Sequence, residues 1–138
     1  MGMRGNFEEG YSGDTLQGTY LGGVWFPDKT RVGWWKNGYP EYFGKAINAP
    51  SFIGIGITIN GERVDLATSQ FRDFSLTLDL HQGLLTRRFT IEAPEAAVQF
   101  TFRRFVSNVI RQAALIEVTA KVLHGRHTSS LTRRSTAT

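Results

Sequence analysis

Four carboxylates near the N-terminus lie among aromatic and glycine residues and are the first candidates for chemistry: Glu8, Glu9, Asp14 and Asp28. Two such groups on either side of a glycosidic bond can act as general acid and general base. The same residue types are common in solvated loops and turns. We therefore expect these four side chains to be loop or turn residues, with acid/base catalysis as the alternative.

The segment that contains these carboxylates is rich in aromatic residues. Residues 1–45 hold all three tryptophans, all four tyrosines and ten of the fifteen glycines. In two runs, 25–29 and 32–43, large rings are interleaved with Gly, Pro and hydrogen-bonding side chains. Sugar rings stack on Trp and Tyr while their hydroxyls need polar partners, and protein interfaces use the same aromatic anchors. The segment predicts a carbohydrate contact or a protein interface, and a small satellite core under a long loop is the remaining alternative.

Several other chemistries lack the residues or the spacing that they need. His81, His124 and His127 form no cluster at helical or strand spacing, so we expect no metal site. The chain has no cysteine, which excludes a disulfide framework, a thiolate metal site and a cysteine nucleophile. Gly54 and Gly56 lie within a strand pattern and no GxxxxGK[ST] follows, so we expect no phosphate-cradling loop.

The net charge of +4 is unevenly distributed. Residues 1–123 hold 13 Lys and Arg against 12 Asp and Glu, whereas residues 124–138 hold three Arg and no acidic residue. Because nucleic-acid binding needs several phosphate contacts on one face, we expect no nucleic-acid partner. The C-terminal segment has one leucine in fifteen residues and no apolar periodicity, so we expect it to be disordered or unrelated to the rest. A small phosphate anchor at Arg133 and Arg134 is the alternative.

The elements that position these residues are predicted by apolar residues at every second position. The strongest hairpin signal is Asn60-Gly61, because this dipeptide readily adopts the positive φ angles of a two-residue turn. A second turn is predicted at residues 81–83. The predicted strands are 53–59, 62–66, 74–80, 85–92, 98–102 and 113–123.

One of these strands loses its alternation near its end. After Phe102, arginines occupy positions 103 and 104 before Phe105, so we predict a bulge or a bend there. Residues 1–45 are predicted to be mostly loops, and no ten-residue stretch carries a helical period. Short strands separated by turn residues predict a mainly β fold, an antiparallel β-sandwich or barrel rather than an α/β fold.

Four runs of residues match a known pattern. They are MRGNFEEG at 3–10, GTYLGG at 18–23, PDKTRVGWWKNGYP at 27–40 and NAP at 48–50. With these runs the sequence resembles the N-terminal domain of glycoside hydrolase family 65 over about residues 2–123. The run at 27–40 is most similar to members that split maltose, and members that split trehalose or kojibiose are the alternatives.

The resemblance implies an inverting enzyme that cleaves a disaccharide with inorganic phosphate to give β-glucose 1-phosphate and glucose. Phosphate is then a co-substrate, and no metal or organic cofactor is implied. The family resemblance also implies a large antiparallel β-sandwich that packs on an (α/α)6 barrel, and a homodimer. The general acid and the phosphate-binding residues belong to that barrel, so no catalytic residue is assigned to this chain.

On the same basis, residues 1–123 are predicted to be part of the N-terminal sandwich and residues 124–138 a separate tail. The aromatic loop is predicted to line the substrate entrance or an interface through Trp34, Trp35, Lys36, Asn37 and Tyr39. We expect the chain alone to be inactive and structural, and a stand-alone carbohydrate-binding sandwich is a further alternative. Because the first residues show no signal region and no apolar run is long enough to span a membrane, we expect a cytoplasmic protein.

Overall fold

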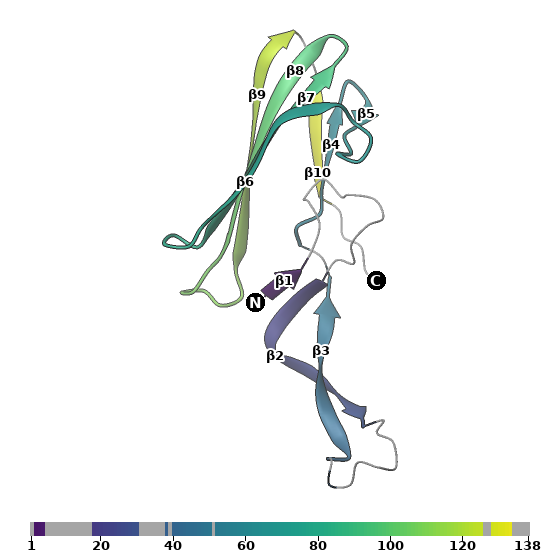
Figure 1. The fold of residues 1–138 in the computed structure, drawn as a ribbon, viewed down its shortest axis with the longest axis vertical. Coiled ribbons are helices and arrows are strands. Elements are labelled where there is room, and N and C mark those ends of the chain that lie inside the picture. The colour runs from purple at the N-terminus through teal and green to yellow at the C-terminus, as the bar shows by residue number, and fades with distance from the viewer. Residues whose placement is uncertain are drawn as a thin grey trace.

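The computed structural model describes residues 2–4, 18–30, 38, 40–50, 52–125 and 128–133, and these residues form strands, turns and loops but no helix. The strands make three antiparallel sheets, ordered β1-β2-β3, β10-β4-β5 and β6-β7-β8-β9. Their bounds are β1 Gly2–Arg4, β2 Gly18–Lys29, β3 Tyr42–Ala49, β4 Ile55–Ile59, β5 Glu62–Arg63, β6 Phe71–Asp79, β7 Leu84–Ala93, β8 Ala96–Val106, β9 Ala114–Gly125 and β10 Ser129–Arg133. The sheet that contains β4 faces one end of the four-stranded sheet, and β2 and β3 extend away from both (Figure 1). The predicted mainly β, antiparallel sandwich class is confirmed.

Both predicted turns are present. Asn60 and Gly61 have φ angles of 51° and 85°, and Ile59 pairs with Glu62 across the turn. Between β6 and β7, the Asp79 carboxylate accepts hydrogen bonds from the backbone N–H groups of His81 at 2.9 Å and Gln82 at 3.0 Å. Local turn chemistry therefore sets where these two hairpins reverse.

Strand β6 begins earlier than the alternation predicted, because a bulge interrupts it. Asp73 has a φ of 56°, and the register with β7 shifts between Arg72 and Ser75. The extra residue keeps Phe71 and Phe74 on the same face of the sheet, where their rings meet edge to face at 6.1 Å. The bulge explains why alternation is visible only from Phe74 onward.

The bulge predicted at the end of β8 is wrong. Arg103, Arg104 and Phe105 pair in unbroken register with β9, and the register shifts instead between Ala97 and Val98. Strand β8 lies between two partners, so its backbone ladders hold the pleat regardless of which side chains point inward. As a result Arg104 lies on the inner face and Phe105 on the outer face, where it is 41% exposed.

The loops predicted for residues 1–45 are partly strands. β1 pairs with the start of β2, and β2 pairs with β3 from Thr19↔Ala49 to Lys29↔Tyr42, with a register shift between Tyr20 and Trp25. Both faces of this ribbon carry large apolar side chains, so it shows no alternation of apolar and polar residues. This explains why the pattern of residues 18–49 did not predict strands.

The prediction of a disordered or unrelated segment over 124–138 is wrong for residues 129–133. These residues form β10, which pairs with β4 from Ser129↔Ile59 to Arg133↔Ile55. Asn60 and Thr128 add two reciprocal hydrogen bonds of 2.9 Å, one in each direction. Backbone hydrogen bonds to β4 hold β10 in place. Because such pairing does not require a periodic pattern of apolar residues, the sequence pattern did not predict this strand.

Gly125 ends β9 at the point where the chain leaves the four-stranded sheet. Its φ is 81°, and a Cβ at this position would lie 1.8 Å from the carbonyl oxygen of Glu95. Only glycine fits so close an approach of two backbones.

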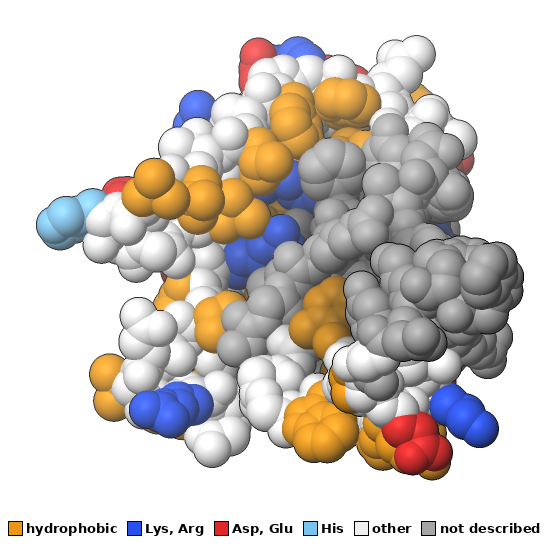
Figure 2. Space-filling view, turned by 60° about the horizontal axis from the view of Figure 1, so that its bottom comes forward, with side chains coloured by type: hydrophobic (Ala, Val, Ile, Leu, Met, Phe, Trp, Pro, Cys, Tyr) orange, Lys and Arg blue, Asp and Glu red, His pale blue; other side chains and the backbone are white. Residues whose placement is uncertain are grey.

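The inner face of the four-stranded sheet borders a hollow. Figure 2 shows hydrophobic side chains along this hollow and Lys or Arg side chains deep within it. Register places Leu76 and Leu78 of β6, Leu85 and Arg87 of β7 and Phe102 and Arg104 of β8 on this face. Leu76 and Leu78 are exposed, so β4, β5 and β10 cover only part of the face.

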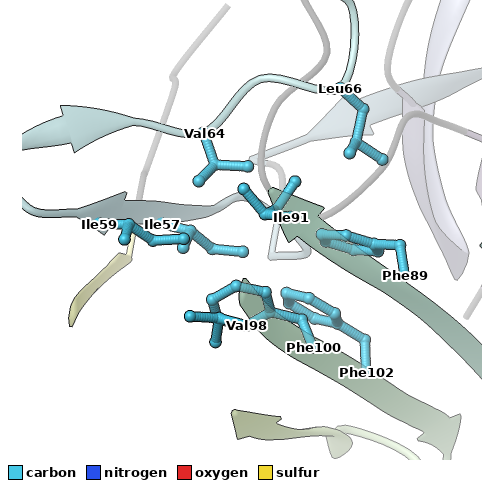
Figure 3. Packing of buried hydrophobic residues seen from close by; sticks show 9 residues of the cluster. All are labelled: Ile57, Ile59, Val64, Leu66, Phe89, Ile91, Val98, Phe100 and Phe102. Atoms are coloured by element: carbon cyan, nitrogen blue, oxygen red, sulfur yellow. The ribbon is translucent and has the colours of Figure 1, made fainter. Parts of the chain in front are cut away.

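The core fills the covered part of that face. Phenylalanine rings from β7 and β8 meet aliphatic side chains from β4 and from the segment after β5 (Figure 3). Phe89 lies 5.8 Å from Phe100 and stacks at 6.0 Å on Phe102, centroid to centroid. The cluster comprises Ile57, Ile59, Val64, Leu66, Phe89, Ile91, Val98, Phe100 and Phe102.

The packing predicts that Phe100→Ala destabilises the chain by about 3–5 kcal/mol, because it removes a fully buried ring and leaves a cavity between the sheets. Urea unfolding of the purified 138-residue chain measures this loss. Leu80→Ala is the control, since Leu80 is 84% exposed and its change should stay within about 0.5 kcal/mol. Equal effects of the two substitutions would contradict the assigned core.

Three glycine substitutions should rank in a fixed order of stability loss. Gly125→Ala costs most because it adds a backbone clash to a positive φ. Gly61→Ala costs about 1–2 kcal/mol, since its φ is positive but nothing lies within 4 Å of the added methyl. Gly22→Ala, where no positive φ and no neighbour within 4 Å are found, should be neutral. Thermal unfolding ranks the three variants, and any other order contradicts the backbone geometry.

Candidate functional site

The five residues predicted to line an entrance or an interface, Trp34, Trp35, Lys36, Asn37 and Tyr39, lie outside the described residues. The structure describes both ends of the connection that contains them. Lys29 pairs with Tyr42, the Thr30 N–H donates to the Glu41 carbonyl at 2.9 Å, and the Thr30 hydroxyl donates to the Pro40 carbonyl at 2.6 Å. The connection from residue 31 to residue 39 is therefore carried at the end of the β2–β3 ribbon.

The ribbon carries aromatic side chains on both faces. Trp25, Pro27 and Tyr42 share one face by register, and Phe26 and Phe43 share the other. The Trp25 indole lies over Gly44, whose added Cβ would be 3.5 Å from the ring. Small side chains on β3 thus leave room for the indole to lie flat against the strand.

These side chains remain accessible in the isolated chain. Trp25 is 59% exposed and Tyr42 is 54% exposed, and Phe26 and Phe43 are exposed as well. An open groove of about 470 Å³ lies along the Trp25 face, lined by Leu21, Gly23, Val24, Trp25, Gly44 and Ala46. A two-stranded ribbon with this much exposed apolar surface is typical of a docking element rather than a free-standing one.

Of the four carboxylates considered first, the structure describes only Asp28, while Glu8, Glu9 and Asp14 lie outside the described residues. The Asp28 carboxylate pairs with the Lys45 ammonium at 3.5 Å across the ribbon. An exposed pair of this kind adds little stability but fixes the two side chains on the Phe26 face. Asp28 is therefore a strand residue of β2 and not the loop or turn residue that the sequence predicted, and its carboxylate is paired with a cation.

Further ion pairs lie on the outer face of the four-stranded sheet. Arg72 hydrogen-bonds to the Glu92 carboxylate and pairs with Asp73, and Arg103 pairs with Glu117 at 3.1 Å. The hydrogen bond that Arg72 donates to the Glu92 carboxylate, followed by the charges of Asp73 and Glu92, raises the pKa of Arg72 above its ordinary value. The pairs of Arg72 with Glu92 and of Arg103 with Glu117 are exposed and join neighbouring strands of the sheet, and exposed pairs of this kind add little stability.

Sequence reasoning missed one buried charged residue among those that the structure describes. Arg87 is 2% exposed on the inner face, and its guanidinium carbon lies 4.6 Å from the Phe102 ring centroid and 5.2 Å from that of Phe89. The signal was present, because Arg87 has the same strand phase as Phe89 and Ile91, which are core residues. Burying a charged side chain is costly unless it is paired or hydrogen-bonded, so an inward arginine is not a position that apolar alternation predicts.

Across the described ranges, no group of three or more His, Asp or Glu side chains is arranged to hold a metal ion. No helix in that part of the chain is long and apolar enough to cross a membrane.

Comparisons with known proteins identify the domain. Residues 1–135 match glycosyl hydrolase family 65, N-terminal domain. The chain is 51% identical over 125 residues to the maltose phosphorylase of Bacillus subtilis (strain 168), covering 91% of this chain and 16% of that protein. It is 27% identical to a kojibiose phosphorylase of Thermoanaerobacter brockii, over 78% of this chain and 12% of the relative. It is also 27% identical to an alpha,alpha-trehalose phosphorylase of the same organism, over 86% and 16% of the two chains.

A solved structure agrees with these relatives. A protein described as a kojibiose phosphorylase from the human microbiome superposes with a TM-score of 0.74 at 28% identity, over 87% of this chain and 16% of that chain. The chain therefore spans about a sixth of the length of these proteins. The match of nearly every residue to one domain, together with the fold, shows that this chain belongs to glycosyl hydrolase family 65, as its N-terminal domain.

Proposed function

We propose that this chain is the N-terminal part of a maltose phosphorylase, an enzyme that converts maltose and inorganic phosphate into β-glucose 1-phosphate and glucose with inversion. The observation that carries this proposal is the 51% identity to a maltose phosphorylase over 91% of the chain. Identity to the kojibiose and trehalose phosphorylases is 26–28%. Those two substrates are the alternatives.

In this scheme the chemistry belongs to parts of the enzyme beyond these residues. A carboxylic acid protonates the leaving glycosidic oxygen while phosphate attacks the anomeric carbon from the opposite face, which inverts the configuration. Phosphate is the co-substrate, and the scheme uses no metal or organic cofactor. The described carboxylates of this chain are exposed, in turns or ion-paired, so we assign no catalytic residue to it.

The role proposed for this domain is structural. The aromatic β2–β3 ribbon packs against the helical barrel and brings the connection that contains Trp34, Trp35, Lys36, Asn37 and Tyr39 to the substrate entrance. The exposure of Trp25 and Tyr42 in the isolated chain supports this proposal, because such a surface is normally covered. Assembly as a homodimer and a cytoplasmic location are part of the same proposal.

The proposed division of labour predicts where activity resides. A longer protein that carries this domain and the barrel should form glucose 1-phosphate from maltose and phosphate, with lower activity on trehalose and kojibiose. The purified 138-residue chain should form none. An enzyme-coupled glucose 1-phosphate assay measures both. Activity of the short chain would contradict its structural role, and a preference of the longer protein for trehalose or kojibiose would contradict the proposed substrate.

The entrance role predicts a particular kinetic pattern for Trp34→Ala in that longer enzyme. The substitution should raise KM for maltose several-fold and change kcat by less, because it removes binding that the ground state and the transition state share. Leu80→Ala is the control, since Leu80 is 84% exposed in the turn between β6 and β7, away from the ribbon, and should leave both constants unchanged. Initial rates over a range of maltose concentrations measure both constants. Unchanged kinetics of Trp34→Ala would show that the tryptophan only packs the loop.

A further inference from the structure

Strand β9 forms one edge of the four-stranded sheet, where it pairs with β8 (Figure 1). No described strand pairs with its other side. An edge strand presents unpaired backbone N–H and C=O groups to any strand that approaches it. The register with β8 is unbroken from Val106↔Ala114 to Val98↔Val122, and residues 114–122 include no proline or glycine. This side of β9 is therefore a regular template for a further antiparallel strand.

The opposite edge of the sheet, β6, is less regular. Its register with β7 shifts between Arg72 and Ser75, where Asp73 has a φ of 56° and pairs with Arg72. Bulges and charged side chains of this kind hinder edge-to-edge pairing between chains. Of the two edges of this sheet, β9 is thus the one that suits pairing with another chain.

The outer-face side chains of β9 are arranged symmetrically about Thr119. Glu117 lies two residues before Thr119, Lys121 lies two residues after it, and all three are exposed. Glu117 pairs with Arg103 at 3.1 Å, whereas Lys121 forms no ion pair with a described residue. If a second β9 approached in antiparallel orientation with Thr119 opposite Thr119, each Glu117 would face the Lys121 of the other copy. Opposite charges that face each other across a strand pair stabilise it.

The inner-face side chains match in the same register. Ile116 would face Val122 of the second copy, and Val118 would face Ala120. Val122 is 44% exposed in the isolated chain, and Ile116 and Val118 border an open groove of about 410 Å³ between β9 and the sheet of β4 and β10. Aliphatic side chains would thus cover one another on one face of the joined strands, while opposite charges pair on the other face.

Neighbouring registers lose the charge match. Directly opposite residues of an antiparallel pair have side chains on the same face, so a symmetric pair of strands centres on one residue. Centring the pair on Val118 would place Glu117 opposite Thr119. Centring it on Ala120 would place Glu117 opposite Leu123, which has no partner in the register with β8. The charges therefore select the register centred on Thr119.

We propose that β9 pairs antiparallel with β9 of a second copy of this chain, in the register centred on Thr119. The two four-stranded sheets then form one continuous sheet across a two-fold axis. Such an interface uses the same surface of both copies, so assembly closes at two chains. The proposal rests on the homodimer proposed above, whose surface it names, and it does not depend on which disaccharide the enzyme splits.

Sedimentation equilibrium of the purified 138-residue chain tests the proposal. The apparent mass should rise with concentration from 15.5 kDa toward twice that value. Glu117→Lys and Lys121→Glu should each raise the Kd of the dimer by roughly tenfold or more, because each sets two pairs of like charges against each other. An equimolar mixture of the two variants should restore association, because one strand then carries two cations and the other two anions.

Arg88→Glu is the matched control for Lys121→Glu. Arg88 is exposed on the outer face of β7, and its substitution changes the net charge equally, so the dimer should stay intact. Far-UV circular dichroism shows whether each variant is folded. If Glu117→Lys unfolds because it loses the pair with Arg103, Lys121→Glu decides alone.

Three results would overturn the proposal. A monomeric wild-type chain would mean that a strand of another origin covers this edge. A dimer that Lys121→Glu weakens no more than Arg88→Glu does, or a mixture of the two folded β9 variants that stays monomeric, would exclude the proposed register. None of these measurements uses maltose, so the proposed substrate is tested only by the glucose 1-phosphate assay.

Discussion

The packing of aliphatic side chains from β4 and from the segment after β5 against the phenylalanines of β7 and β8 holds two sheets of this domain together. Ile57 and Ile59 reach the four-stranded sheet from β4, and Phe89 and Phe100 meet them from β7 and β8. The extent of this contact determines which part of the inner face of the four-stranded sheet stays uncovered. It covers one end of the inner face, so Leu76 and Leu78 remain exposed. An apolar face that is half covered is the mark of a domain that is completed by other parts of the protein.

The β2–β3 ribbon is a second apolar surface that the described strands leave uncovered. Among the residues that the structure describes, none forms a second layer over it, and its aromatic side chains are exposed on both faces. A pair of strands buries too little surface to stabilise itself in water. The ribbon is therefore an arm whose order depends on what it contacts, and this accounts for its concentration of Trp, Tyr and Phe in a segment without core periodicity.

The sequence predicted those parts of the fold in which turn residues mark the chain reversals and one face of each strand is buried. Asn60-Gly61 reverses the chain as expected, and alternation located β7 and β9, because one face of each strand meets the core. The alternation of apolar and polar residues gave wrong predictions where an inward side chain is charged or where a strand is held by backbone pairing alone. The inward Arg104 suggested a bulge that the backbone ladders do not make, and β10 is held by pairing with β4 alone. Of the site, the family resemblance identified the domain, while the buried Arg87 needed the register to be seen.

We propose that the open inner face and the aromatic ribbon are surfaces that the rest of a family 65 enzyme covers. Hydrogen–deuterium exchange, compared between the 138-residue chain and a longer protein that includes it, tests this claim most directly. The account predicts that amides of β2, β3 and β6 exchange much more slowly in the longer protein, while amides of β7 and β8 change little. Equal exchange of β2, β3 and β6 in the two proteins would contradict it.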